Sequence, residues 1–235
     1  MPFEEILRGG FDELGIPCPE GAIDRYRIYC DYLAEINQVM NLTAISGDED
    51  TARLHFLDCA ALAGIESFAG KRAIDVGTGA GFPGLALKIA CPDLDLTLLD
   101  SLDKRINFLK NTCEKLNFTD VTCIHARAEE APADYRGSFD FALSRAVARL
   151  NLLCELCLPF VKKGGLFLAM KSTDHEAELK EAMPAIRTLG GTLERVENYR
   201  IPGTDITHSV ICIRKTGSTP AKYPRRWALI KKNPL

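Results

Sequence analysis

The sequence lacks any apolar run that approaches the roughly 20 residues a helix needs to cross a bilayer. Its first residues, Met1 to Glu5, carry acids where a signal peptide carries bases. We therefore expect a cytoplasmic protein without a membrane segment.

The sequence also lacks a clustered set of metal ligands. It has only four histidines, and they lie far apart, at His55, His125, His175 and His208. Its nine cysteines are an odd number scattered through apolar stretches, which indicates reduced thiols and not a disulfide framework. Cys154 and Cys157 are the only close pair, and we interpret them as a buried helix face because a zinc site needs further ligands at suitable spacing. No metal is expected.

Acidic residues are absent from the last part of the chain. The formal net charge is −3, but from Arg214 onward the sequence has seven bases and no acid. They are Arg214, Lys215, Lys222, Arg225, Arg226, Lys231 and Lys232. An acidic body with a basic tail predicts a localised contact with a polyanion. A solvated, partly disordered terminus is the alternative, and composition leaves both open.

The hydrophobic periodicity changes once along the chain. Tyr26, Tyr29 and Leu33 recur at steps of three and four, which predicts a buried helix face within an N-terminal helical extension over residues 1–70. Later, short β-rich runs alternate with helical patterns, as in a parallel sheet with crossover helices. Strands are predicted near 72–77, 95–100, 121–126, 139–144, 165–171, 191–201 and 207–214.

These patterns predict an α/β protein with a seven-stranded, mostly parallel sheet. The last two strands follow each other without a helix, so we expect them to form an antiparallel edge. A Rossmann-like domain over 71–216 and a basic C-terminal tail over 217–235 complete the predicted organisation.

A glycine-rich turn follows the first predicted strand, in the segment from Asp75 to Gly84, Asp-Val-Gly-Thr-Gly-Ala-Gly-Phe-Pro-Gly. Glycines such as Gly77 and Gly79 let a backbone approach a ligand closely, and the pattern also satisfies a dinucleotide fingerprint. The candidate cofactors are therefore NAD and S-adenosylmethionine, and Asp75 distinguishes between them. Its carboxylate would repel the pyrophosphate of NAD. The same charge would attract the sulfonium and ammonium of S-adenosylmethionine. We therefore predict S-adenosylmethionine as the cofactor.

Two further positions are predicted to bind this cofactor. Asp100 ends the second strand, where a carboxylate can accept hydrogen bonds from both ribose hydroxyls. An acid at the start of the next helix is the alternative role for Asp100. Ala128 and Glu129 follow the third strand, where such folds commonly contact the adenine. For Glu129 this assignment rests on position alone.

The fourth predicted strand ends at Ser144-Arg145 and usually faces the transferred methyl group. It carries no Asp/Asn-Pro-Pro-aromatic box, as amino-group methyltransferases do, and no Pro-Cys nucleophile of the cytosine-C5 kind. The remaining acceptors are already nucleophilic, such as a ring nitrogen with a free lone pair, for which positioning supplies much of the acceleration. Arg145 could hold the cofactor carboxylate, which we favour, or donate to a guanine O6. A surface salt bridge is its structural alternative.

The chain closely resembles the glucose-inhibited division protein B family of bacterial 16S ribosomal RNA guanine-N7 methyltransferases. The likeness covers most of the sequence and rests on several motifs in order. They are 41–45 (Asn-Leu-Thr-Ala-Ile), 55–58 (His-Phe-Leu-Asp), 75–84, 144–146 (Ser-Arg-Ala), 163–165 (Lys-Gly-Gly), 169–171 (Ala-Met-Lys) and 222–226 (Lys-Tyr-Pro-Arg-Arg). The chain departs from the family after this last motif, where Trp227-Ala-Leu-Ile stands in place of small, turn-forming residues.

The resemblance implies cofactor contacts by Gly77, Phe82, Ala128, Glu129 and Arg145. It implies a guanine of the small-subunit decoding region as substrate, in 16S ribosomal RNA or an assembling small ribosomal subunit. Candidate RNA contacts are Asn41, His55, Lys171, Lys222, Arg225 and Arg226, with Asp58 as a possible partner of His55. We expect a monomer whose tail lies outside the cofactor crevice. A small-molecule methyltransferase, a nicotinamide-dependent oxidoreductase and a nucleotide-sensing module are the alternative functions.

Overall fold

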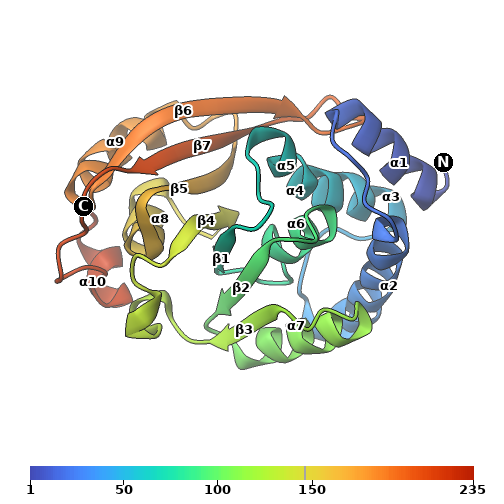
Figure 1. Cartoon of the computed structure of the whole chain (residues 1–235), viewed down its shortest axis with the longest axis horizontal. Helices are drawn as coiled ribbons and strands as arrows, with labels where there is room; N and C mark the ends of the chain where they lie inside the picture. The colour runs from blue at the N-terminus through green and yellow to red at the C-terminus, as the bar shows by residue number, and fades with distance from the viewer. Residues whose placement is uncertain (146) are drawn as a thin grey trace.

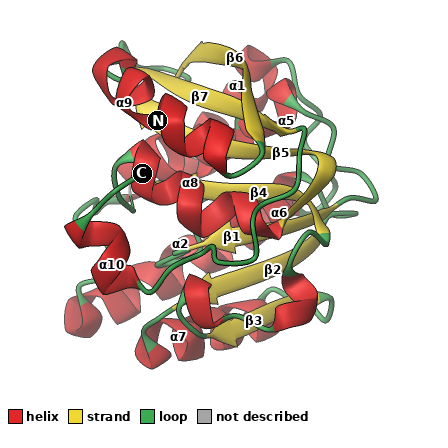
Figure 2. Cartoon of the chain, turned by 90° about the vertical axis from the view of Figure 1, so that its left-hand side faces the viewer, coloured by secondary structure: helices red, strands yellow, loops and turns green. Residues whose placement is uncertain are grey.

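The computed structural model describes residues 1–145 and 147–235. Its strands form one sheet in the order β3-β2-β1-β4-β5-β7-β6, which Figure 2 shows from β3 at the bottom to β6 at the top. The strands are β1 (Arg72–Val76), β2 (Asp95–Asp100), β3 (Val121–His125), β4 (Phe139–Arg145), β5 (Val161–Ser172), β6 (Gly191–Arg200) and β7 (Thr207–Lys215). The five strands β1 to β5 are parallel, whereas β7 is antiparallel to β5 and to β6. The predicted seven-stranded sheet with an antiparallel edge is confirmed.

Helices cover both faces of this sheet. The N-terminal set consists of α1 (Phe3–Leu14), α2 (Ala22–Met40), α3 (Asp48–Asp50), the π-helical η1 (Thr51–Leu57), α4 (Asp58–Ala60) and α5 (Leu62–Ile65). The later helices are α6 (Gly84–Ala90), α7 (Asp103–Lys115), η2 (Ala128–Glu130), η3 (Ala133–Tyr135), α8 (Leu150–Cys157), η4 (Leu158–Phe160), α9 (Glu176–Thr188) and α10 (Trp227–Lys232). In Figure 1, α8, α9 and α10 lie to the left of the sheet, and α1, α2 and α6 lie to the right.

Side chains alternate along each strand and so divide the core into two layers. Ala73 and Leu98 belong to the layer under α1, α2, α6 and α7, whereas Ile74 and Leu99 belong to the layer under α8 and α9. Such alternation follows from the period of two in a strand. Cys154 and Cys157 are buried on α8, which confirms that this pair is a helix face.

The N-terminal helices are part of the first layer. Tyr26, Tyr29 and Leu33 are buried on one face of α2, as their spacing predicts. The Tyr26 hydroxyl donates to the carbonyl of Ala86 in α6 at 2.8 Å, and the Tyr29 hydroxyl donates to the carbonyl of Ala80 in the glycine turn. The extension therefore supports the turn that is predicted to bind the cofactor.

The basic tail is attached to the body of the protein. The Arg225 guanidinium donates to both carboxylate oxygens of Glu155 on α8, at 2.8 and 2.6 Å, and Glu155 is fully buried. Ile230 of α10 is also fully buried. A solvated, disordered terminus is therefore the wrong interpretation of this segment. The placement does not support Arg225 as an RNA contact either, because a buried carboxylate already balances its charge.

Among the described residues, no helix is both long and apolar enough to cross a membrane.

Candidate functional site

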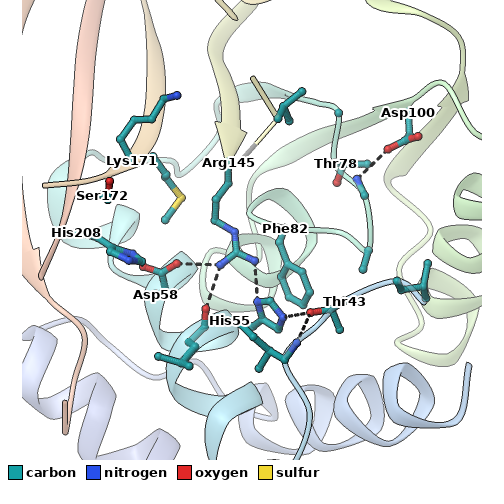
Figure 3. Close-up of a pocket in the computed structure, with 18 of the residues that line it drawn as sticks. Thr43, His55, Asp58, Thr78, Phe82, Asp100, Arg145, Lys171, Ser172 and His208 are labelled. Carbon is teal, nitrogen blue, oxygen red and sulfur yellow. Dashed lines mark hydrogen bonds and ion pairs between the residues drawn. The ribbon is translucent and has the colours of Figure 1, made fainter. Parts of the chain in front are cut away.

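Two neighbouring cavities open at the carboxyl ends of the parallel strands. The larger, about 930 Å³, lies between the glycine turn, the end of β4 and the edge of β7, and Figure 3 shows most of its lining residues. The smaller, about 220 Å³, lies between the ends of β2 and β3 and the start of α10. Gly77, Asp100, Ser101 and Val147 line both cavities. In open α/β sheets, ligands bind in the crevice at this edge.

The glycine turn forms one wall of the larger cavity. Gly79 has a φ of +62°, and a Cβ atom there would meet nothing within 4 Å, so this part of the backbone is open to a ligand. Gly81 has a φ of +100° and lies against the Tyr29 hydroxyl, where a side chain would collide. These conformations favour glycine and explain why the turn needs it. Phe82 lines the same cavity.

Asp75 lies beneath the glycine turn. Its side chain is fully buried, and one carboxylate oxygen accepts the amide of Gly84 at 2.8 Å. The other oxygen, Oδ1, has no hydrogen-bond partner among residues 1–145 and 147–235. Burial raises the pKa of Asp75 to about 6. Asp75 does not line either cavity, so its direct contact with a cofactor stays a prediction.

Asp100 stands between the two cavities. One of its oxygens accepts the Gly79 amide at 3.0 Å and an Arg105 N–H at 3.3 Å. The other accepts the amide of Leu102, just before α7, at 2.9 Å. Asp100 thus fixes the glycine turn and the start of α7, and it also borders both cavities. Both sequence-based roles for Asp100 are compatible with this geometry.

Ala128 and Glu129 line the smaller cavity, as expected of residues near an adenine. Trp227 lines it as well, and its backbone N–H donates to the Glu129 carboxylate at 2.8 Å. The expectation that the tail lies outside this crevice is therefore wrong. Sequence reasoning did not place Trp227 at this cavity, because a residue after the last strand has no fixed place in the pattern of strands and helices.

Arg145 occupies the centre of the larger cavity wall (Figure 3). Its guanidinium donates to Asp58 at 2.8 Å, to His55 Nδ1 at 2.7 Å and to the carbonyl of Leu54 at 3.1 Å. It lies 4.9 Å from the centre of the Phe82 ring. A guanidinium has five N–H groups, so these bonds leave two for a ligand. A surface salt bridge is the wrong interpretation of Arg145, because Asp58 is fully buried.

His55 is held in one neutral form. Its Nδ1 accepts from Arg145, which cannot give up its proton, so the ring proton must be on Nε2 and is donated to the Thr43 hydroxyl at 2.8 Å. The ring stacks on Phe82 at 4.2 Å between centroids. Burial, together with the nearby Arg145 cation, lowers the pKa of His55 to about 3. His55 is therefore neutral and unable to act as a base near pH 7.

This depressed pKa predicts a dependence of stability on pH. Unfolded His55 takes up a proton below its ordinary pKa of 6.5, whereas folded His55 does so only near 3, so stability is lost as pH falls through this window. Between pH 5.5 and 4.5 the free energy of unfolding of the wild type should fall by about 1.4 kcal/mol more than that of His55→Gln. Urea denaturation at the two pH values measures this difference.

The exposed His125 provides the control for this experiment. Its side chain is 49% exposed and lies outside the Arg145 network, so His125→Gln measures what the loss of a histidine elsewhere does to the same two free energies. If the free energy of unfolding fell by the same amount between pH 5.5 and 4.5 in the wild type and in His55→Gln, the neutral form that the geometry assigns to His55 would be contradicted.

Asp58 contacts two further side chains, Tyr199 and His208, that sequence reasoning did not find. The Tyr199 hydroxyl donates to Asp58 at 2.6 Å, and His208 Nδ1 lies 2.8 Å from the same oxygen. His208 and Arg145, together with the hydroxyl of Tyr199, hold the pKa of Asp58 below its usual range despite burial. The bond to Asp58 raises the pKa of His208. The predicted partnership of His55 and Asp58 is thus indirect, through Arg145.

The predicted RNA-contact residues fall into two groups. His55 and Lys171 line the larger cavity, where the Lys171 ammonium donates to Glu178 and to the carbonyl of Ala148, each at 2.8 Å. Asn41, Lys222 and Arg226 are exposed and lie outside both cavities. The structure does not bring these three residues to the cavity, so their contact with RNA stays a prediction. Across the described part of the chain, no group of three His, Cys, Asp or Glu side chains could hold a metal ion.

Comparison with known proteins identifies relatives of the whole chain. The model of a family described as rRNA small subunit methyltransferase G matches residues 22–207. A ribosomal RNA small subunit methyltransferase G from Acetivibrio thermocellus is 44% identical, and the match covers 100% of this chain and 98% of the relative. A second one, from Alkaliphilus oremlandii, is 46% identical, and the match covers 100% of both chains.

Solved structures of methyltransferases share the fold. A precorrin-6y C5,15-methyltransferase from Geobacter metallireducens superposes with a TM-score of 0.51 at 16% identity, over 68% of this chain and 87% of the other. TYW2 from M. jannaschii, solved in complex with AdoMet, superposes with a TM-score of 0.54 at 13% identity. This match covers 67% of this chain and 74% of TYW2. These likenesses show the Rossmann-like methyltransferase fold. With full-length relatives above 40% identity and a family model that matches most of its length, the chain belongs to the rRNA small subunit methyltransferase G family.

Proposed function

We propose that the protein transfers a methyl group from S-adenosylmethionine to N7 of a guanine in 16S ribosomal RNA. The observation that carries the proposal is the full-length identity of 44–46% with proteins named ribosomal RNA small subunit methyltransferase G. Membership of this family favours methyl transfer over hydride transfer or nucleotide sensing. The substrate we infer is the RNA itself or an assembling small subunit, met in the cytoplasm by a monomer.

The residues present fit S-adenosylmethionine. Asp100 borders both cavities and is suited to the ribose between them. Ala128 and Glu129 would lie at the adenine, and Gly77, Gly79, Phe82 and Arg145 at the methionine part. The unpartnered Oδ1 of Asp75, beneath the turn, adds negative charge where the cofactor is positive.

The cofactor supplies an electrophilic methyl group on its sulfonium, and the protein supplies position and electrostatics. N7 of guanine has a lone pair and loses no proton when it is methylated, so no general base is needed. His55 fits this requirement because its Nδ1 lone pair is engaged by Arg145. The network of Arg145, His55 and Asp58 therefore orients ligands and does not move protons. We infer that one of the two remaining N–H groups of Arg145 holds the cofactor carboxylate.

The proposed function is tested by mapping the methylated nucleotide. Small-subunit RNA from a strain that lacks the gene is incubated with the protein and labelled S-adenosylmethionine, and the label is located by cleavage at N7-methylguanine. We expect one labelled guanine in 16S RNA. RNA from the parent strain is the control, because its site is already methylated and should accept little label. Label in another RNA, or at several guanines of 16S RNA, would overturn the assignment.

A further inference from the structure

The tail contributes an aromatic residue, Trp227, to the lining of the smaller cavity. Trp227 is half-buried at the first position of α10 and lines this cavity together with Asp100, Ala128 and Glu129. It belongs to the segment in which the chain departs from the pattern of the family, so the family motifs assign it no role.

Several contacts hold Trp227 in place. Two residues before it, Arg225 forms its ion pair with the buried Glu155, and its backbone N–H also donates to Glu155 at 2.8 Å. Three residues after it, Ile230 is fully buried against the α8 layer. The backbone N–H of Trp227 donates to Glu129. Trp227 therefore begins a short helix that is fixed on both sides.

The chemistry of the cavity suits a flat, aromatic ligand with polar edges. Its walls include the apolar side chains of Leu99, Val147 and Leu156. The carboxylates of Asp100 and Glu129 lie among the same lining residues. Aromatic side chains stack on nucleobases in a way that tolerates any base, because every base has a π-face. Adenine, attached to the ribose that we place at Asp100, is the group that reaches this cavity.

We propose that Trp227 contacts the cofactor and that its indole packs against the adenine. The C-terminal tail is then a wall of the cofactor site as well as a basic surface. The proposal rests on the cofactor placement given under the proposed function. It assigns a binding role to a residue for which neither the glycine turn nor the family motifs provide one.

The test uses the fact that Trp227 is the only tryptophan of the chain. Its fluorescence therefore reports on one position. Addition of S-adenosylhomocysteine to the full-length protein should change the emission, and titration calorimetry gives the dissociation constant. A second ligand, 5′-methylthioadenosine, keeps the adenosine and lacks the amino-acid part.

Trp227→Ala should raise the dissociation constant of both ligands by about tenfold or more, which corresponds to the loss of one base–aromatic stack. Trp227→Phe keeps an aromatic face and should retain most of the affinity. Leu229→Ala is the matched control, because Leu229 is on the same helix, is 54% exposed and does not line the cavity. It should bind both ligands as the wild type does.

Three results would overturn the inference. They are an unchanged ligand affinity in Trp227→Ala, an unchanged tryptophan emission when the wild type binds a ligand, and an equal loss of affinity in Trp227→Phe and Trp227→Ala. The last would mean that Trp227 only anchors the tail. Failure of the wild type to bind either ligand would overturn the proposed function, and this inference with it.

Discussion

Replacement of Arg145 by methionine is expected to lower the free energy of unfolding by about 3 kcal/mol, because the loss of one partner leaves a buried charge behind. The charge in question is Asp58, whose side chain is fully buried. His208 and Tyr199 still contact Asp58 in the variant, which places the loss at the lower end of the range for such pairs. Urea denaturation at pH 7 measures it.

Arg149 is the matched control for this experiment. It is the next arginine along the chain and pairs with Glu181, but the two side chains are 60% and 52% exposed. Exposed ion pairs contribute little, so Arg149→Met should change the free energy of unfolding by no more than about 0.5 kcal/mol. Equal losses in Arg145→Met and Arg149→Met would contradict the buried network.

Two further variants separate charge from shape. Arg145→Lys should not restore stability fully, because one ammonium cannot reproduce the planar set of bonds to Asp58, His55 and the Leu54 carbonyl. The double variant Arg145→Met with Asp58→Asn should be less destabilised than the sum of the single variants, since it no longer buries an unpaired charge. Simple additivity would mean that the two residues act independently.

An RNA that carries 7-deazaguanine at the target position is expected not to be methylated at all. This base keeps the Watson–Crick edge of guanine and replaces the nucleophilic nitrogen with carbon. If N7 is the acceptor, the change removes the attacking lone pair and leaves the other contacts in place. Label transfer from S-adenosylmethionine to the two RNAs, with guanine or 7-deazaguanine at one position, measures the effect.

Binding of the two RNAs is the control for this result. The 7-deaza RNA should bind and should compete with the guanine RNA, because the phosphates that dominate affinity are unchanged. Methylation of the 7-deaza RNA at the same position would refute N7 as the acceptor. Loss of binding together with loss of methylation would instead show that N7 is needed for recognition.

Much of the sheet could be predicted from the sequence because alternation, glycine turns and helix spacing are local signals. The predicted start of β1 at Arg72 and the predicted bounds of β2, Asp95 to Asp100, agree with the structure. The predicted start of β5 at residue 165 is too late, because the strand begins at Val161 in the structure. Lys162, Lys163 and Gly164 are exposed and polar there, so that part of the strand has no apolar pattern.

The site could be predicted only in part. Asp100 ends β2, and Ala128 and Glu129 follow β3, so their position relative to a strand fixes which edge of the sheet they reach. His208 could not be found in this way, because its place depends on the register of β7 against β5, where it lies opposite Ser172. The place of Trp227 at the smaller cavity could not be predicted for a related reason, since it depends on the pairing of Arg225 with Glu155 through space.

The attachment of α2 to the glycine turn bears on how this family can change over time. Tyr26 and Tyr29 share one hydrophobic layer with α6 and donate hydrogen bonds to backbone carbonyls beside the turn. Residues 1–70 therefore cannot be exchanged between homologues as an independent module, although their helical pattern sets them apart in the sequence. A substitution that removed the hydroxyl of either tyrosine would leave the carbonyl of Ala80 or Ala86 without this partner, and a side chain at Gly81 would collide with Tyr29. The extension and the turn should thus co-evolve, and recombination between distant homologues at residue 70 should be selected against.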